Sequence, residues 1–490
     1  AIMSIISVDN LTFCYDGSYD NIFENVSFKI DTDWRLGFIG RNGRGKTTFL
    51  NLLMGRYRYS GSVSAAVSFD YFPFEVPDAS MTTLEVIESV SPDYEHWRLM
   101  KELNLMKATE DILYRPFSTL SNGERTKALL AALFIKENNF LLIDEPTNHL
   151  DMEARRMVSD YLKNKNGFIL VSHDRAFLDK CIDHVLSINK STIEVQKGNF
   201  STWQLNKEMR DNFEIDKNEK LKKDIARLKR AAGRMAGWSD DIEETKIGFG
   251  PCDRGNIGAK AAKMMRHAKA VETRRERAVE EKEKLLKDIE YFSPLKVNPM
   301  PYFSDTLLSL KGVGISYGGR MACRDVSFTI RQGDRIALCG KNGCGKSSVL
   351  KLILGENLEF EGEVNIGSRL KISYVRQDTS KLSGSLTAFA KSRGIDESLF
   401  KTILRKLDFS RIQFEKDISD YSEGQKKKTL IAGSLCECAN LYVWDEPLNF
   451  IDVMSRMQIE RLIMESMPTM LIVEHDEAFL NLVATDIIRL

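Results

Sequence analysis

The chain has 490 residues, enough for more than one domain with its own core. Lys plus Arg and Asp plus Glu both number 70, so the net charge is zero and any basic surface must be local. No apolar run approaches the roughly 20 residues that span a bilayer, and residues 1–4 lack a signal-peptide pattern, so we expect a cytoplasmic protein. The eight cysteines show no paired zinc spacing and are expected to be reduced thiols without a metal role.

Strands are expected in the first part of the chain at residues 5–8, 26–30 and 36–39, and the last of these leads into a glycine-rich loop and a helix near Phe49. Further buried strands are expected at residues 140–143 and 168–171. The same order returns at residues 335–339, 349–354, 441–444 and 471–473. Alternating strands, loops and helices predict an α/β fold with a mostly parallel sheet, present twice.

A different kind of sequence separates the two copies. Residues 205–234 and 260–292 carry apolar residues at helical spacing, and a glycine-rich stretch at about 234–258 lies between them. This pattern predicts an antiparallel helical hairpin. We therefore expect domains at residues 1–204 and 301–490, joined by a hairpin at residues 205–300.

Basic residues gather on both sides of the predicted tip. Residues 217–234 contain eight basic and two acidic side chains, and residues 260–277 contain seven and two. A solvated coiled-coil face usually mixes both signs, so this concentration favours binding to an RNA phosphate backbone.

A phosphate-binding motif of the form Gly-x-x-x-x-Gly-Lys-Thr/Ser occurs in each copy, about 300 residues apart. Its glycines let backbone N–H groups converge on phosphate oxygens at a helix N-terminus. We expect the lysines to reach the β- and γ-phosphates and the following hydroxyls to bind Mg²⁺. The expected ATP-binding residues are Gly40, Asn42, Gly43, Gly45, Lys46, Thr47 and Thr48 in the first copy, and Gly340, Asn342, Gly343, Gly345, Lys346, Ser347 and Ser348 in the second.

Acidic residues follow a buried strand in each copy. Asp144 and Asp445 stand at strand ends, where α/β sheets place their ligands, and are expected to bind Mg²⁺. Glu145 and Glu446 are the candidate catalytic residues that polarise the attacking water. His173 and His475 follow the next strand and are candidate contacts to the γ-phosphate.

Residues 4–204 and 305–490 resemble the ABC ATPase superfamily. The resemblance identifies residues 120–124 and 421–425 as signature motifs, so that Ser121 and Gly123 would cap ATP held by the second domain, and Ser422 and Gly424 ATP held by the first. It also places Tyr15 and Tyr317 against adenine. Gln377 matches the Mg²⁺-sensing glutamine, whereas the first copy has no amide in its segment at residues 71–74.

Two such domains around a helical hairpin resemble the ABC-F group, and the Glu-Pro-Thr-Asn-His-Leu-Asp run at residues 145–151 is typical of it. The long insert, residues 71–74 and residues 424–428 resemble its antibiotic-resistance ribosome protection members, which act against lincosamides, pleuromutilins and streptogramin A. The resemblance implies a monomeric, ATP- and Mg²⁺-dependent ATPase that binds the bacterial 70S ribosome through the tRNA exit site, P-site tRNA and 23S rRNA near the peptidyl-transferase centre. The tip residues expected near the drug pocket are Trp238, Ile242, Ile247 and Phe249.

Three alternatives remain open at the level of sequence. A housekeeping ABC-F translation factor that relieves stalled ribosomes would use the same ATP sites and hairpin. The ATPase subunit of an ABC transporter would need a membrane partner, and its two domains are not normally separated by a basic hairpin. A DNA-repair ABC ATPase would carry a far longer hairpin or zinc-binding cysteines, whereas this insert has only Cys252, so no DNA partner is expected.

Overall fold

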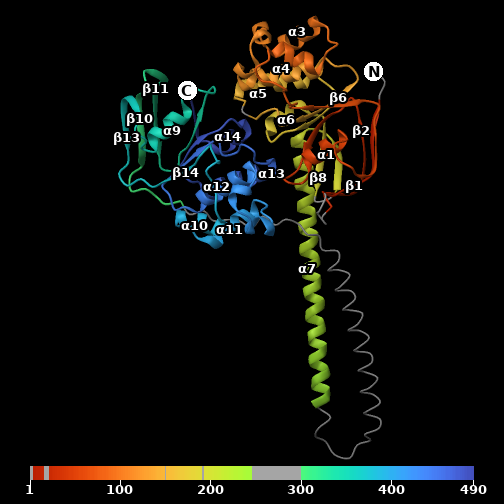
Figure 1. Cartoon of the computed structure of the whole chain (residues 1–490). Coiled ribbons are helices and arrows are strands. Elements are labelled where there is room, and N and C mark those ends of the chain that lie inside the picture. The colour runs from red at the N-terminus through yellow and green to blue at the C-terminus, as the bar shows by residue number, and fades with distance from the viewer. Residues whose placement is uncertain (1–3, 16–20, 149, 190–191, 245–298) are drawn as a thin grey trace, which may run out of the picture. The chain divides into compact units, whose positions relative to one another are not determined.

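The computed structural model describes residues 4–490 apart from residues 16–20, 149, 190–191 and 245–298 (Figure 1). The chain separates into two compact units. One unit contains residues 1–201 and 294–490, and the other contains residues 202–293. The first unit carries two copies of one α/β architecture, called the first and second halves below.

The first half contains two sheets. A three-stranded antiparallel sheet has the order β2-β1-β4, and a six-stranded sheet has the order β5-β6-β7-β3-β8-β9. The strands from β5 to β8 in that order run parallel, and β9 is antiparallel to β8. The strands are β1 Ile5–Phe13, β2 Phe23–Asp31, β3 Arg35–Ile39, β4 Ser60–Ser64, β5 Ser68–Phe72, β6 Asn139–Asp144, β7 Phe168–Val171, β8 His184–Asn189 and β9 Thr192–Lys197.

The second half repeats this arrangement. Its antiparallel sheet has the order β11-β10-β13, and its core sheet has the order β14-β15-β16-β12-β17 with every neighbouring pair parallel. The predicted α/β fold with mostly parallel core sheets is therefore confirmed. The strands are β10 Thr306–Tyr317, β11 Arg320–Arg331, β12 Arg335–Cys339, β13 Glu359–Ile366, β14 Ile372–Val375, β15 Leu441–Asp445, β16 Met470–Val473 and β17 Asp486–Arg489.

Helices follow the strands in the same order in both halves. In the first half they are α1 Lys46–Leu53, α2 Thr83–Val90, α3 His96–Leu105, α4 Asn122–Phe134, α5 Met152–Lys163 and α6 Arg175–Cys181, with 3₁₀ turns at Glu110–Tyr114 and Phe117–Thr119. In the second half they are α9 Lys346–Ile353, α10 Leu386–Arg393, α11 Glu397–Lys406, α12 Glu423–Cys436, α13 Val453–Ser466 and α14 Glu477–Val483, with 3₁₀ turns at Arg411–Glu415 and Ile418–Asp420. None of the helices in the described ranges combines the length and apolar character of a membrane span.

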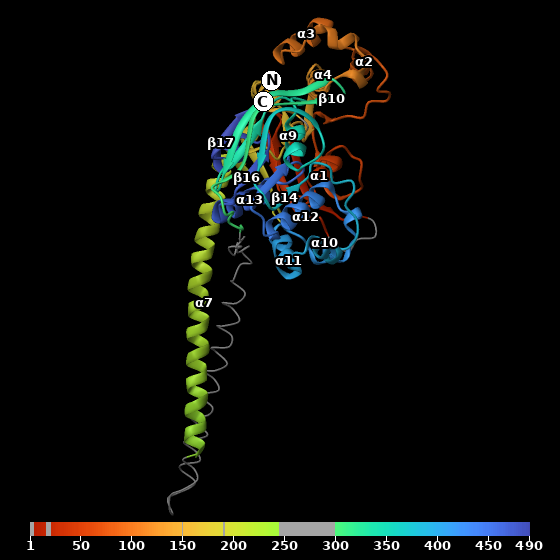
Figure 2. The same cartoon turned by 90° about the vertical axis from the view of Figure 1, so that its left-hand side faces the viewer.

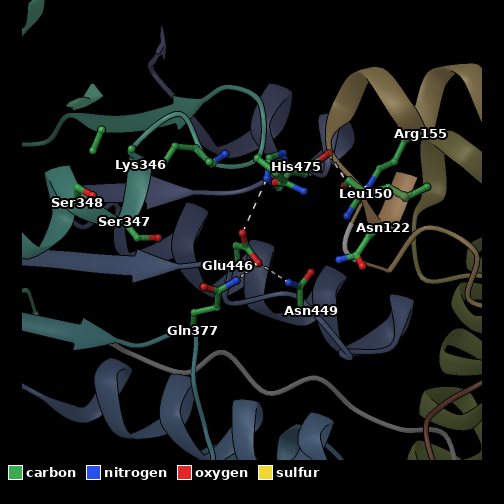
Figure 3. A pocket seen from close by; sticks show the side chains of 14 residues that line it. Asn122, Leu150, Arg155, Lys346, Ser347, Ser348, Gln377, Glu446, Asn449 and His475 are labelled. Carbon is green, nitrogen blue, oxygen red and sulfur yellow. Dashed lines mark hydrogen bonds and ion pairs between the residues drawn. The ribbon is translucent and has the colours of Figure 1, made fainter. Parts of the chain in front are cut away.

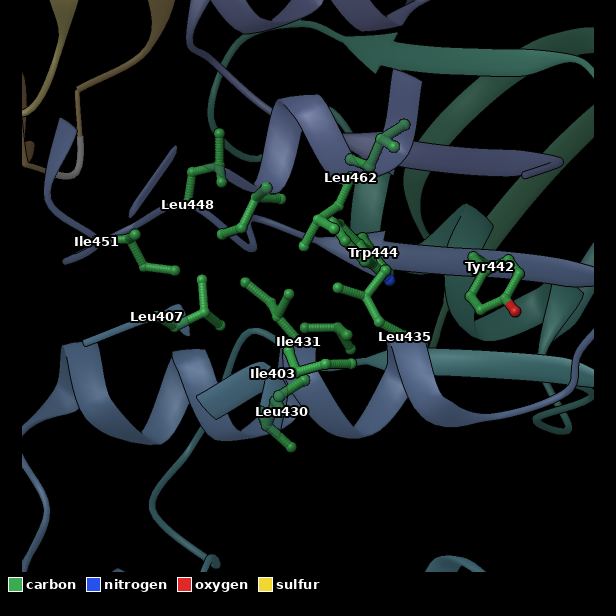
Figure 4. Packing of buried hydrophobic residues seen from close by; sticks show 14 of the residues in the cluster. Ile403, Leu407, Leu430, Ile431, Leu435, Tyr442, Trp444, Leu448, Ile451 and Leu462 are labelled. Carbon is green, nitrogen blue, oxygen red and sulfur yellow. The ribbon is translucent and has the colours of Figure 1, made fainter. Parts of the chain in front are cut away.

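The core of the second half explains why its catalytic strand is fixed in place. Strand β15 is buried along its whole length, as expected for a central strand of a parallel sheet. Trp444 is fully buried, packs in one cluster with Leu430, Ile431 and Leu435 of α12, and donates from Nε1 to Ser434 Oγ at 3.0 Å (Figure 4). The residue that follows Trp444 is a candidate metal ligand, so this packing sets its position.

Helix α7, Phe200–Glu244, differs from the expected first arm of the hairpin. The arm was expected to end at residue 234, but the helix continues through Gly233 and Gly237 to Glu244. Figures 1 and 2 show α7 as one unbroken helix. An isolated glycine costs a helix only about 1 kcal/mol, and Arg, Ala and Met between these glycines favour the helix. The helix therefore includes the backbone of Trp238 and Ile242. The second arm, together with Ile247 and Phe249, lies outside the described residues.

Replacing Trp444 with Ala should destabilise the second half strongly. The change removes a fully buried indole, and such truncations cost about 3–5 kcal/mol. Denaturant unfolding followed by circular dichroism measures the loss. Trp97→Ala is the matched control, because Trp97 is 60% exposed and its loss should change the free energy of unfolding by less than about 0.5 kcal/mol. Equal effects of the two changes would contradict this picture of the core.

Candidate functional site

Each phosphate loop ends at a position that only glycine can occupy without strain. Gly45 and Gly345 have φ values of 89° and 93° and form the N-caps of α1 and α9. A Cβ at Gly45 would lie 2.5 Å from Ile22, and a Cβ at Gly345 would lie 2.8 Å from the carbonyl of Ala322. The helices therefore start at Lys46 and Lys346, with their N-terminal N–H groups directed at the loop.

The loop lysines are buried and lie against the loops that precede them. Lys46 Nζ donates to the carbonyls of Gly40 at 2.7 Å and Arg41 at 3.1 Å. Lys346 Nζ donates to the carbonyls of Gly340 and Lys341, both at 2.9 Å. Burial lowers the pKa of Lys46, an effect opposed by nearby carboxylates.

A carboxylate and a hydroxyl that are both candidate Mg²⁺ ligands meet beside each loop. Thr47 Oγ1 donates to Asp144 Oδ2 at 3.0 Å, and Ser347 makes the matching side-chain bond to Asp445. Burial raises the pKa of Asp144, and burial together with Glu446 raises that of Asp445 to about 6. These residues supply only oxygen atoms, which Mg²⁺ prefers.

The donor set of the second half fits Mg²⁺ in a further respect. Asp445 Oδ1 is buried and has no hydrogen-bond partner among the described residues. A buried carboxylate oxygen without a partner costs free energy, and a cation removes that cost. In the same described part of the chain, no cluster of three or more His, Cys, Asp or Glu residues forms a metal site.

The candidate bases share an unusual backbone conformation. Glu145 has a φ of 51° and Glu446 a φ of 45°, in the left-handed region that non-glycine residues rarely adopt. Each is held there by a bond from its backbone N–H to the neighbouring strand, at 2.8 Å to Val171 O and 2.9 Å to Val473 O. Strain of this kind gathers at functional sites.

The two candidate histidines lie beside these carboxylates. His173 Nε2 is 3.2 Å from Glu145 Oε1, and His475 Nε2 is 3.9 Å from Glu446 Oε1. Burial lowers the pKa of His475 to about 4 and that of His173 well below its usual value. Both rings are therefore neutral at pH 7 and can act as hydrogen-bond partners of a phosphate oxygen.

The second carboxylate accepts from two side-chain amides, and one of these has no amide counterpart in the first half. Glu446 Oε2 accepts from Gln377 Nε2 at 2.6 Å and from Asn449 Nδ2 at 2.8 Å (Figure 3). In the first half, Phe74 stands at the position of Gln377. Burial and the charge of Asp144 raise the pKa of Glu145 to about 8. The two halves therefore present chemically different carboxylates.

The first half has a feature that the sequence analysis did not assign to the site. Tyr71 donates its hydroxyl to Asp144 Oδ2 at 2.8 Å, so this carboxylate already accepts two hydrogen bonds. Burial and Asp144 raise the pKa of Tyr71, which keeps the phenol protonated as a donor. A tyrosine recurs at this position in both repeats, since Tyr374 stands at the same place in the second half, and this recurrence could have pointed to Tyr71.

Both sites are completed by the opposite half. Asn42 Nδ2 donates to Phe450 O at 2.8 Å, and a Cβ at Gly424 would collide with that same carbonyl. The second site is a cavity of about 380 Å³ between the halves (Figure 3). Its lining includes Asn122, Leu150 and Arg155 from the first half and Lys346, Ser347, Gln377, Glu446, Asn449 and His475 from the second.

The signature residues lie at helix N-termini. Ser121 caps α4 in a reciprocal pair with Glu124, and Ser422 caps α12 in the same way with Gln425. Asn122, which separates Ser121 from Gly123, lines the second cavity. The pairing of each signature motif with the opposite phosphate loop stays a prediction.

The two tyrosines expected to stack on adenine contact the residues that follow Thr47 and Ser347 in the phosphate loops. Tyr15 OH lies 2.7 Å from Thr48 Oγ1, and Tyr317 OH donates to Ser348 Oγ at 3.2 Å. The two tyrosines are 42% and 45% exposed, so both are accessible from solvent. A role in adenine stacking remains a prediction.

Arg155 is a second residue that the sequence analysis missed. Its guanidinium bonds to Leu150 O at 3.0 Å and Asp174 at 3.2 Å, and reaches His475 O of the opposite half at 3.4 Å. An arginine recurs at the matching position of both repeats, and this recurrence could have identified Arg155 from the sequence. Its counterpart in the second half, Arg456, bonds to Asp476 at 2.8 Å.

Removing the amide of Gln377 should slow the second site. A hydrogen bond to a charged group is worth about 1.5–3 kcal/mol, so Gln377→Leu should lower turnover by roughly 10- to 100-fold. The rate is measured in a Glu145→Gln background, in which the second site supplies the activity. Phe74→Leu is the control at the matching position and should leave that rate unchanged. Unaltered turnover in the Gln377 variant would rule out this role for the amide.

Comparison with known proteins agrees with this geometry. The family model described as ABC transporter matches residues 23–148 and 323–449, which together exceed half of the chain. The ribosome protection protein VmlR of Bacillus subtilis (strain 168) is 28% identical over 97% of this chain and 85% of its own length. The ATP-binding protein Uup of Buchnera aphidicola is 27% identical over 98% of this chain and 79% of its own length.

A solved structure shares the fold. The archaeal ribosome recycling factor aABCE1, crystallised with the ribosomal stalk protein aP1, gives a TM-score of 0.61 at 18% identity and covers 98% of this chain and 87% of its own. At this identity the similarity concerns the fold alone. The paired ATP-binding domains and the relatives together establish that the chain belongs to the ABC transporter family, as an ATPase of the ABC-F subfamily.

Proposed function

We propose that this ATPase binds the bacterial ribosome and confers antibiotic resistance by displacing drugs from the peptidyl-transferase centre through its interdomain linker. The observation that carries the proposal is the similarity to a ribosome protection protein along 97% of the chain, linker included. The long helix α7 that follows the first half in the chain, and the basic segment at residues 217–234 within it, support the proposal. A ribosomal partner would place this activity in the cytoplasm.

The residues of each site suggest a division of roles in ATP hydrolysis. The loop lysines and backbone N–H groups would bind the phosphates, and the Asp and Thr or Ser side chains would hold Mg²⁺, which neutralises phosphate charge when bound. Glu145 and Glu446 would each accept a proton from the water that attacks the γ-phosphorus. In the same step the bond between the γ-phosphorus and the β,γ-bridging oxygen would break. His173 and His475, both neutral, would hold a γ-phosphate oxygen.

Nucleotide binding would hold the two halves together. Ser121 with Gly123, and Ser422 with Gly424, would contact the γ-phosphate bound by the opposite half, so each ATP would bridge the halves. An ion pair and a hydrogen bond already cross the same boundary, from Arg175 to Glu460 at 3.0 Å and from Asn42 to Phe450 at 2.8 Å. Hydrolysis would remove the bridge and release the ribosome.

The linker would make the contact that matters for resistance. Its basic segments, residues 217–234 and 260–277, suit the phosphates of 23S rRNA near the exit site and of P-site tRNA. Trp238, Ile242, Ile247 and Phe249 would lie nearest the drug pocket and reshape it through rRNA. The protein would act as a monomer, because both composite sites form within one chain.

Replacing both candidate bases should trap the ribosome complex. Glu145→Gln with Glu446→Gln keeps the size of both side chains but removes the proton acceptors, so ATP should bind and persist. We expect turnover to fall by at least about 100-fold and the protein to sediment with 70S ribosomes only when ATP is present. The unsubstituted chain with ADP is the control. Undiminished turnover would refute the catalytic assignment, and no ATP-dependent sedimentation would refute the ribosomal partner.

A further inference from the structure

Lys427 is a buried lysine in α12 that the roles assigned above do not use. Only 2% of its surface is exposed. Its Nζ donates to the carbonyls of Arg376 and Glu446, each at 3.1 Å, and lies 3.5 Å from the carbonyl of Asp445. Burial lowers the pKa of Lys427, and the carboxylates of Glu474, Asp445 and Glu446 oppose that effect.

These three carbonyls belong to the two segments that build the second catalytic centre. Arg376 precedes Gln377, whose amide donates to Glu446. Asp445 and Glu446 are the candidate metal ligand and base, and Glu446 has the strained positive φ. A single ammonium group therefore joins the backbone of the base to the backbone of its amide donor.

A buried carboxylate completes this arrangement. Glu474 is 2% exposed, accepts from Leu448 N at 2.9 Å through Oε1, and accepts from His475 N at 2.7 Å through Oε2. It therefore ties the turn after Glu446 to the backbone of the candidate histidine. Lys427 and Glu474 therefore contact the same turn, Lys427 at the carbonyl of Glu446 and Glu474 at the N–H of Leu448.

The first half has neither charge. Thr126 stands five residues after Ser121, as Lys427 does after Ser422, and its hydroxyl bonds to Asn122 O within its own helix at 2.9 Å. Ser172 precedes His173 where Glu474 precedes His475, and it lies 3.2 Å from Thr147 Oγ1. The charged bracing is thus confined to the half that also has the amide donor.

We propose that Lys427 is a positioning residue of the second ATP site, where its ammonium group fixes the backbone of Glu446 against the segment that carries Gln377. Its loss leaves buried carbonyls without a donor and frees both segments to move. The effect falls on the geometry of the base rather than on nucleotide binding, because Lys427 is not among the residues that line the cavity. The proposal rests on the roles assigned above to Glu145 and Glu446.

The test compares turnover at the two sites of the full chain. Lys427→Met is combined with Glu145→Gln to report the second site, or with Glu446→Gln to report the first. In the former background kcat should fall about tenfold, as expected for loss of a charged donor, while KM stays within about twofold. In the latter background kcat should stay within about twofold, which also shows that the protein is folded.

A neighbouring lysine gives the matched control. Lys426 lies on the same helix, and its ammonium group is 3.7 Å from Glu423 Oε1, so Lys426→Met should leave kcat at both sites unchanged. Lys427→Thr, which installs the residue of the first half, should reproduce the loss at the second site. Equal losses at both sites, a rise in KM alone, or an unchanged kcat at the second site would each overturn the proposal. No ribosome or drug enters the assay, so its outcome is independent of the proposed ribosomal function.

Discussion

The contact between each phosphate loop and the opposite half is the constraint on which the rest of the structure depends. Asn42 of the first loop bonds to the carbonyl of Phe450, and Gly424 of the second signature motif packs against that same carbonyl. A Cβ at position 424 would collide with Phe450 O of the same half and lie 3.1 Å from Asn42 Nδ2 of the opposite half, so a side chain there would disturb this contact. Because each site takes residues from both halves, nucleotide binding and the pairing of the halves are linked, and a protein of this kind can convert ATP binding into a change in domain contact.

The two sites are built on one plan but differ in chemistry. In the second, Glu446 accepts two amide hydrogen bonds and its turn is braced by buried Lys427 and Glu474. In the first, Asp144 accepts from Tyr71, and burial raises the pKa of Glu145 to about 8. The two candidate bases therefore lie in different surroundings, one contacted by two amide donors and the other with its pKa raised by burial and by the charge of Asp144.

Much of this architecture was predictable because the repeat doubles every local signal. The phosphate loops, the strands before them and the capped signature helices follow from glycine, hydrophobic and capping patterns. Residues such as Lys427, Arg155 and Tyr71 were missed because their roles depend on partners 18 to 73 residues away along the chain or in the opposite half. The end of the first linker arm was placed too early, because two glycines were given more weight than the helix-forming residues around them.

Protection of ribosomes from drugs is the proposed function, and cell-free translation measures it directly. A bacterial translation extract is inhibited with lincomycin or tiamulin, and the purified protein is added with ATP. We expect protein synthesis to recover with ATP and to stay inhibited when ADP replaces ATP. Ribosome binding without recovery would contradict the resistance role and favour a housekeeping translation factor of the same subfamily.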